Sequence, residues 1–167
     1  MPHPVVYPHN FNALLKQWDE QRAKDRETGT PTFIANGECA RLPQELTNVG
    51  HTTRWQPGPP VVEVARTLKP GTVIANFMWE WNTGWFPSTH TYHAALFIRG
   101  EGYSTVTGKP SQIVVFDQFK GHGNAHTPGP RTIRAYTYEQ AKEVERVWRT
   151  KIYPCDNANE FYVVLVR

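Results

Sequence analysis

The segment Asn36-Gly37-Glu38-Cys39-Ala40-Arg41-Leu42 is the part of the chain from which the fold is best predicted. Gly37 permits a tight turn between an extended segment and a helix, so we expect Cys39 at the start of a helix. A helix N-terminus lowers the pKa of a thiol, and its free N–H groups can receive an oxyanion. Pro43 removes the first internal hydrogen bond of such a helix, which predicts that the helix is short or kinked.

A histidine and a carboxylate follow downstream at the ends of apolar runs. His93 opens the run 93–98, and Asp117 closes the run 113–117. Both runs predict buried strands, which places the two polar residues at the rim of a sheet. An imidazole makes the reactive thiolate available at neutral pH, and a third polar group fixes the imidazole ring. The order therefore predicts Cys39 as nucleophile, His93 as base and Asp117 as the orienting group.

The third position has an alternative. Asp117 and Gln118 point to opposite faces of a strand, so only one of them can meet His93. We favour Asp117 because a carboxylate compensates the charge of the imidazolium that forms during reaction, whereas Gln118 would only orient the ring. The second cysteine, Cys155, follows Pro154 in an expected loop, and we interpret it as structural or incidental.

Composition narrows the class of protein. The chain has 167 residues, and its six Trp, seven Tyr, eight Phe, fourteen Pro and twelve Gly indicate one loop-rich α+β domain. The net charge of +3 lacks the clustered basic footprint of nucleic-acid binding. No apolar run approaches a membrane span, and residues 1–8 do not resemble a signal peptide. Two cysteines make no disulfide framework, so we expect free thiols in a chain made in a reducing cytosol.

The expected elements follow from periodicity and turn signals. Residues 1–32 read as an extended arm and a helix, capped by Asn10, that pack on a catalytic domain over residues 33–167. We expect a rigid turn at residues 56–60 and a loop at residues 120–130. A capping box at Thr137 and Gln140 predicts a helix to about residue 150, with an apolar stripe of Val144, Val147 and Trp148. Strands are expected over residues 72–77, 93–98, 112–118, 131–136 and 161–166.

The aromatic loop 78–87 is a candidate for substrate binding. Its consecutive aromatic residues suit neither one strand face nor a helix stripe, so part of the loop should be exposed. We expect Trp81 and Trp85 to line a substrate cleft, with Arg54 and Trp55 on its other side.

A zinc site is the chemical alternative. His90 with His93, and His122 with His126, have plausible ligand spacings. Neither an H-E-x-x-H nor a paired C-x-x-C motif is present, so we expect no metal and no cofactor.

At these residues the chain resembles the papain-like CHAP and NlpC-type superfamily of cysteine amidohydrolases and peptidases. It looks most like a compact single-domain branch associated with bacterial secretion effectors. The resemblance spans residues 33–166 and is carried by segments 37–42, 52–58, 71–75, 93–97, 115–119 and 157–164. It implies a papain-like α+β fold with the nucleophile helix packed on a central antiparallel sheet.

The resemblance also implies an activity. Such relatives cut amide bonds in peptidoglycan stem peptides, or between peptide and sugar, with roles that map onto Cys39, His93 and Asp117. The relatives often have Gln directly before the cysteine, where this chain has Glu38, and papain has a Gln at the position of Phe33. Asn36 is therefore the candidate side-chain donor to the oxyanion, beside the Cys39 backbone N–H.

The resemblance further implies where such a protein works. It would be made in the bacterial cytoplasm, exported by secretion machinery, and active in the periplasm of a target cell, with an immunity protein as partner. Two other functions remain open at this point. The same residues could deamidate or cleave a host protein, or the chain could be a catalytically inactive module that binds glycan or peptide.

Overall fold

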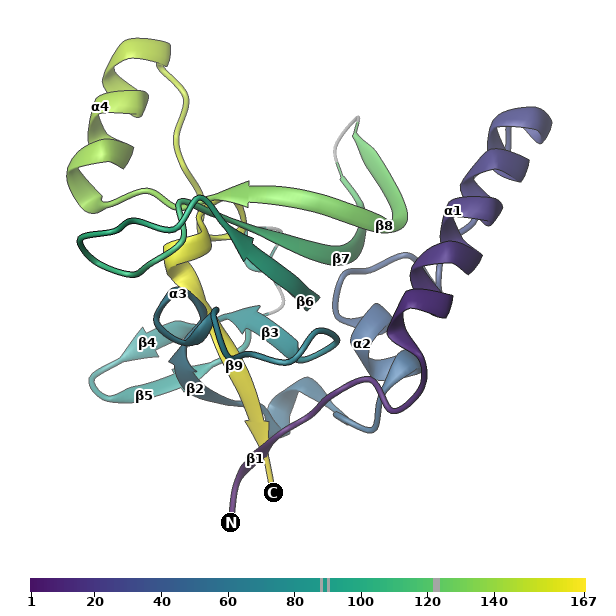
Figure 1. Ribbon diagram of the computed structural model, residues 1–167, viewed down its shortest axis with the longest axis horizontal. Coiled ribbons are helices and arrows are strands. Elements are labelled where there is room, and N and C mark those ends of the chain that lie inside the picture. Colours follow the sequence, from purple (N-terminus) through teal and green to yellow (C-terminus); the bar gives the residue numbers. More distant parts are fainter. Residues whose placement is uncertain (88, 90, 122–123) are drawn as a thin grey trace.

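An antiparallel sheet forms the centre of the fold (Figure 1). The computed structural model describes residues 1–87, 89, 91–121 and 124–167. Within them, the strands of the sheet run in the order β1-β9-β3-β6-β7-β8, and β2 also pairs with β9. Their bounds are β1 (His3–Pro4), β2 (Gln56–Pro60), β3 (Val73–Asn76), β6 (Ala94–Glu101), β7 (Gln112–Lys120), β8 (Ala125–Arg134) and β9 (Phe161–Val166). A separate hairpin joins β4 (Met78–Glu80) and β5 (Thr83–Trp85).

The central strands are buried on both faces because their sequences are almost continuously apolar. In the pairing of β6 with β7, Leu96 lies opposite Phe116, and Phe97 lies opposite Val115. Leu96 and Phe116 belong to one core cluster, while Phe97 and Val115 belong to another. Alternate residues of the same strands therefore support two separate cores, one on each face of the sheet.

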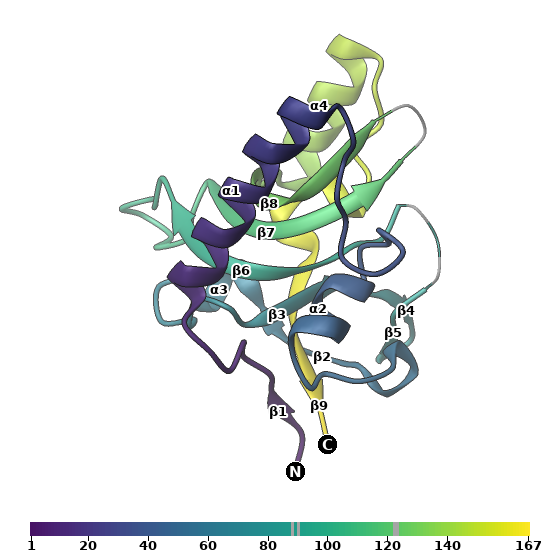
Figure 2. The ribbon, with the colours of Figure 1, turned by 90° about the vertical axis from the view of Figure 1, so that its right-hand side faces the viewer.

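Helices cover the two faces differently. Helices α1 (Phe11–Thr28) and α2 (Arg41–Leu46) pack on the face that Figure 2 turns toward the viewer, and the short α3 (Val61–Val64) packs on the other. The described residues also form three 3-10 turns, η1 (Thr52–Arg54), η2 (Pro154–Asp156) and η3 (Ala158–Glu160). None of the described helices has the length and apolar character needed to cross a bilayer.

The helix boundaries agree with the capping signals. The Asn10 side chain accepts the N–H of Ala13 at 2.9 Å at the start of α1, and Gly29, with φ of 72°, ends it. The capping box of Thr137 and Gln140 starts α4 (Tyr138–Trp148). The arm before α1 adds β1 to the edge of the sheet, where it pairs with β9.

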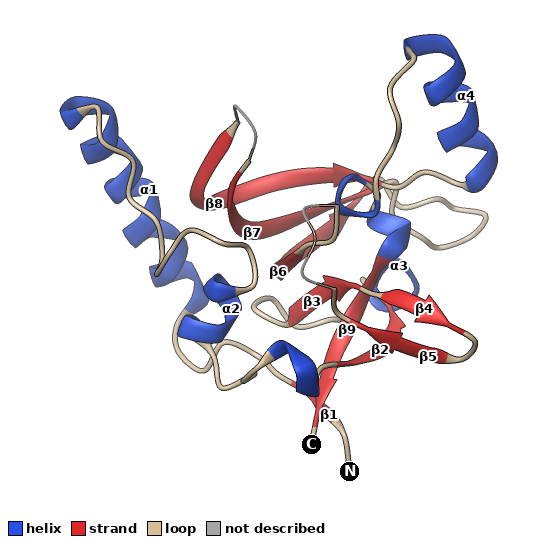
Figure 3. Cartoon of the chain, turned by 180° about the vertical axis from the view of Figure 1, so that it is seen from behind, coloured by secondary structure: helices blue, strands red, loops and turns tan. Residues whose placement is uncertain are grey.

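The stripe expected on α4 does not face the core. This helix extends away from the sheet at the end opposite α1 (Figure 3), and it has no buried residue. Val147 is 53% exposed and Trp148 is 73% exposed. Periodicity predicted the helix correctly, but its apolar side faces solvent and not the core.

Two expected loops are strands. Residues 56–60 form β2, which tolerates its three prolines because it lies at an edge, paired through register Gln56↔Leu165 and Pro57↔Val164. Residues 120–130 were expected as a loop, but β8 begins at Ala125, opposite Lys120. The strand expected over residues 131–136 therefore begins six residues earlier and ends at Arg134.

Candidate active site

Cys39 lies in a turn two residues before α2. Gly37 has φ of 85°, in the left-handed region that favours glycine, which allows the chain to turn sharply into the helix. Helix α2 has only six residues, in agreement with the short helix expected. Pro43 does not remove an internal hydrogen bond as expected, however. It is the third residue of α2, and an N–H at that position has no partner inside a helix.

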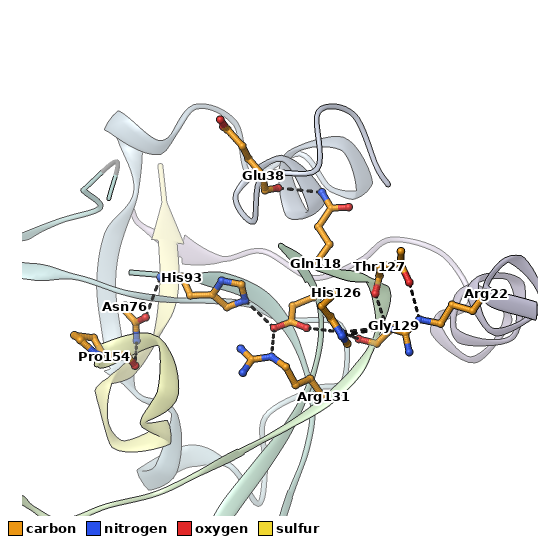
Figure 4. A network of polar contacts seen from close by, with 11 residues as sticks. Arg22, Glu38, Asn76, His93, Gln118, His126, Thr127, Gly129, Arg131 and Pro154 are labelled. Carbon is orange, nitrogen blue, oxygen red and sulfur yellow. Dashed lines mark hydrogen bonds and ion pairs between the residues drawn. The ribbon is translucent and has the colours of Figure 1, made fainter. Parts of the chain in front are cut away.

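Gln118 holds the segment that carries Cys39. Its side chain is fully buried, its Oε1 accepts the N–H of Ile34 at 2.8 Å, and its Nε2 donates to the carbonyls of Ile34 at 2.9 Å and Glu38 at 3.0 Å. Figure 4 shows Gln118 reaching Glu38, away from His93. Gln118 therefore anchors the nucleophile segment to β7 and does not orient the imidazole.

Removing this anchor has an expected cost. Gln118→Ala leaves the N–H of Ile34 without its partner, while the carbonyls of Ile34 and Glu38 keep only the N–H groups of Gly37 and Arg41, which should lower the free energy of unfolding by about 1 to 3 kcal/mol. The displaced segment should also slow alkylation of Cys39. Urea unfolding and iodoacetamide labelling measure the two effects. Gln112→Ala, a change on the same strand near the surface, is the matched control, and equal losses in both variants would contradict the anchoring role.

Asn76 fixes the backbone at His93. Its Oδ1 accepts the N–H of His93 at 2.9 Å, and its Nδ2 donates to the carbonyls of Pro154 at 3.1 Å and Glu160 at 2.9 Å. Asn76 is fully buried at the end of β3, so these bonds hold the start of β6 and the η2 segment together.

Asp117 is the residue of β7 that meets His93. The Nε2 of His93 lies 2.7 Å from Asp117 Oδ2, which leaves Nδ1 for the thiol of Cys39, a hydrogen-bond partner of the ring. Arg131 Nε donates to the same Oδ2 at 2.8 Å, and His126 Nε2 lies 3.0 Å from Oδ1. This last contact has the distance of an ion pair without the alignment of a hydrogen bond. Figure 4 shows the three groups around the carboxylate.

The neighbours shift the pKa values in the directions a thiolate–imidazolium pair requires. Burial by itself raises the pKa of the Cys39 thiol, but the charge and hydrogen bond of His93, with the N–H groups of Ala94 and Ala40, bring it below its usual value. Burial lowers the pKa of His93, but the charge of Cys39 and the hydrogen bond to Asp117 raise it to about 9.

The pKa of Asp117 lies well below its usual range. Burial alone would raise it, but the contacts with His126 and His93 and the charge of Arg131 outweigh that effect. The Asp117 carboxylate is therefore ionised over the whole pH range in which the Cys39 thiol and the His93 imidazole titrate.

A cavity of about 540 Å³ opens over Cys39 and His93. Cys155, which the sequence indicated as structural or incidental, lines the same cavity. Burial and the charge of Asp156 raise the pKa of Cys155 to about 11, so this thiol stays protonated at neutral pH. Both cysteines are free, and among the described residues an imidazole contacts Cys39 but not Cys155.

The difference predicts a pH dependence for labelling. In a Cys155→Ser background, iodoacetamide should alkylate Cys39 at pH values well below about 8.5, the pKa of an unperturbed thiol. His93→Ala should move the profile to higher pH, because burial then acts without the compensating imidazolium. Mass spectrometry of the labelled chain measures both profiles. Superimposable profiles would show that His93 does not activate the thiol.

Four of the residues expected at the cleft do not line this cavity. Trp55 is only 3% exposed and belongs to the core, where it packs on Phe86 with ring centroids 5.0 Å apart. Trp81 is 94% exposed at the turn of the β4–β5 hairpin, and Trp85 is 40% exposed on β5. Arg54 is exposed in η1. The aromatic part of the lining comes instead from Phe86, Tyr92 and Phe119.

Asn36 does not reach the cavity either. It is exposed, and its Oδ1 accepts the N–H of Glu38 at 3.1 Å, which shapes the turn before Cys39. The backbone N–H of Cys39 remains the candidate oxyanion donor.

No group of three or more possible metal ligands occurs in the part of the chain that the structure describes. His90 and His122, one member of each proposed zinc pair, lie outside those residues. His126, a member of the second pair, contacts Asp117 and Arg22.

Comparison with known proteins gives one relevant likeness. No protein-family model matches the sequence, and no curated protein matches it. The structure is similar to a solved structure described as "Type 6 secretion amidase effector 2 (Tae2)", with a TM-score of 0.59 and 27% sequence identity, over 86% of this chain and 92% of that one. The papain-like α+β fold expected from the sequence is confirmed. The likeness is to a secretion amidase effector and does not single out the CHAP or NlpC families.

Proposed function

We propose that this chain is a thiol amidase effector that hydrolyses amide bonds in the peptides of bacterial peptidoglycan. The observation that carries the proposal is that Cys39 and His93 contact each other at one cavity, with His93 bonded through Nε2 to the buried carboxylate of Asp117 behind it. The likeness to a secretion amidase effector supports the reaction class and the biological setting.

The reaction would proceed in two steps. The Cys39 thiolate attacks the carbonyl carbon of the amide, and the proton on His93 Nδ1 passes to the departing amine as the C–N bond breaks. His93 then takes a proton from water, the resulting hydroxide attacks the thioester, and the thiolate leaves. Asp117 holds the ring and balances its charge in both steps. The backbone N–H of Cys39 would donate to the oxyanion in each tetrahedral intermediate.

The setting we propose follows from the same likeness. Secretion machinery would deliver the protein to the periplasm of a target cell, and a cognate immunity protein that covers the cavity would protect the producer. Expression directed to the periplasm should stop growth of a susceptible bacterium, and Cys39→Ala should not. Normal growth with the native protein present in the periplasm would count against a toxin.

Digestion of intact sacculi tests the proposed reaction. Purified native protein should release soluble fragments whose masses reveal a new amino and a new carboxyl terminus at one amide bond. Sacculi of several chemotypes that stay intact would contradict the proposal of peptidoglycan hydrolysis. The alternative function is then cleavage or deamidation of a host protein by the same thiol.

A further inference from the structure

Arg131 is a mostly buried cation whose hydrogen-bonding capacity is only partly used. Its side chain is 21% exposed, and its Nε donates to Asp117 Oδ2. A guanidinium carries five N–H donors in a planar fork. Among the described residues, none accepts a hydrogen bond from the two Nη nitrogens of Arg131. Four N–H donors of Arg131 are therefore not used by the part of the chain that the structure describes.

The available donors face the cavity. Arg131 is one of its lining residues, together with Cys155 and His93. In Figure 4 the Nη nitrogens of Arg131 point to the side on which His93 and Pro154 lie. The charge of Arg131 also lowers the pKa of Cys155, which follows Pro154, so the guanidinium acts across this part of the lining.

Arg131 also lies over an aromatic ring, with its guanidinium carbon 5.4 Å from the ring centroid of Phe119, a contact through the face of the group that leaves its N–H fork free. Arg41 and Lys120 are two further cations in the lining. Arg41 forms an ion pair with Glu45 one turn further along α2. The ammonium of Lys120 lies 4.8 Å from the ring centroid of Phe33. Arg131 combines unused donors with a position beside the catalytic imidazole, because it shares one carboxylate oxygen with His93.

The position of Arg131 beside His93 indicates which half of a substrate it contacts. His93 must protonate the departing nitrogen, so the amine half of the amide extends along the His93 side of the cavity. A mostly buried guanidinium with a free fork is suited to a carboxylate, which accepts two parallel hydrogen bonds. We propose that Arg131 binds a carboxylate on the amine half of the substrate, so that the site selects amides whose amine component is an amino acid with a free carboxylate. This inference rests on the proposed function.

A pair of substrates tests the inference. Two synthetic stem peptides span the bond identified in the sacculus digests and differ only in carrying a carboxylate or a carboxamide on the amine half. Native protein should cleave the carboxylate peptide with kcat/KM about 10- to 100-fold higher, the range expected for charged hydrogen bonds. Arg131→Gln should reduce this ratio to about one, and Arg131→Lys should retain part of it. Arg41→Gln, the matched control, should keep the native ratio.

The ratio separates recognition from positioning. Arg131→Gln also loosens Asp117, which slows both peptides equally and leaves their ratio unchanged unless Arg131 contacts the carboxylate. If the variant is too slow to assay, calorimetry with Cys39→Ala and the double variant Cys39→Ala/Arg131→Gln gives the same ratio from the two Kd values. Equal cleavage of both peptides by native protein, or an unchanged ratio in Arg131→Gln, would overturn the inference alone. Sacculi that stay intact, so that no bond is identified, would overturn the proposed function and this inference with it.

Discussion

Cys39→Ala is expected to lower kcat/KM for peptidoglycan peptides by about 10⁴-fold or more, the loss typical of removing a catalytic nucleophile. The thiol is the only part of the site that forms a bond to the substrate in the proposed reaction. Its removal leaves a cavity that can still bind substrate, so KM should change much less than kcat. Hydrolysis of the carboxylate peptide, followed by chromatography, measures both constants.

Cys155→Ser is the matched control for this variant. The thiol of Cys155 lines the same cavity, but its pKa of about 11 keeps it protonated at neutral pH. Activity within a few-fold of the native rate is expected. A large loss of activity in Cys155→Ser together with a small loss in Cys39→Ala would show that Cys155, not Cys39, is the nucleophile.

Asp117→Asn is expected to lower kcat by about 10³- to 10⁴-fold, because an amide cannot fix the imidazole tautomer or balance its charge. The change also leaves Arg131 without its carboxylate partner in a mostly buried position, which should cost about 3 kcal/mol of stability. Kinetics on the carboxylate peptide and urea unfolding measure the two effects.

The pH profile gives a second signature of Asp117. In native protein, kcat/KM should rise as Cys39 loses its proton below the usual thiol pKa and fall as His93 loses its proton near pH 9. Without the negative charge of Asp117 the pKa of His93 decreases, so the upper limb should move to lower pH in Asp117→Asn. Asp156→Asn, an exposed change in the cavity lining, should preserve rate, stability and profile. Identical behaviour of the two variants would contradict the role of Asp117.

The sequence predicted the centre of the site better than its surroundings. Strand alternation showed that only one of Asp117 and Gln118 could meet His93, and the charge argument favoured the residue that makes the contact. The bonds of Gln118 to the Cys39 segment could not be foreseen, because they join residues at least eighty positions apart through a loop without periodicity. Asn76 was missed for a different reason, since it bonds to the backbone of His93 and not to its ring.

Arg131 was missed because the register of β7 with β8 was not predictable. The strands pair Val115 with Arg131 and Asp117 with Gly129, which makes Arg131 a diagonal neighbour of Asp117 on one face. This pairing could not be predicted from the sequence, because β8 is rich in Gly and Pro and the register shifts after Asp117. Trp55 shows the converse error, since an aromatic residue beside a candidate cleft became part of the core.

The central claim is that the Cys39 thiol performs the hydrolysis, and titration of that thiol tests it most directly. Cys155→Ser protein is alkylated with increasing iodoacetamide, and each sample is divided for mass spectrometry of the Cys39 peptide and for digestion of sacculi. Residual activity should fall in proportion to the alkylated fraction and reach zero at one group per chain. Undiminished digestion by protein whose Cys39 is fully alkylated would contradict the account.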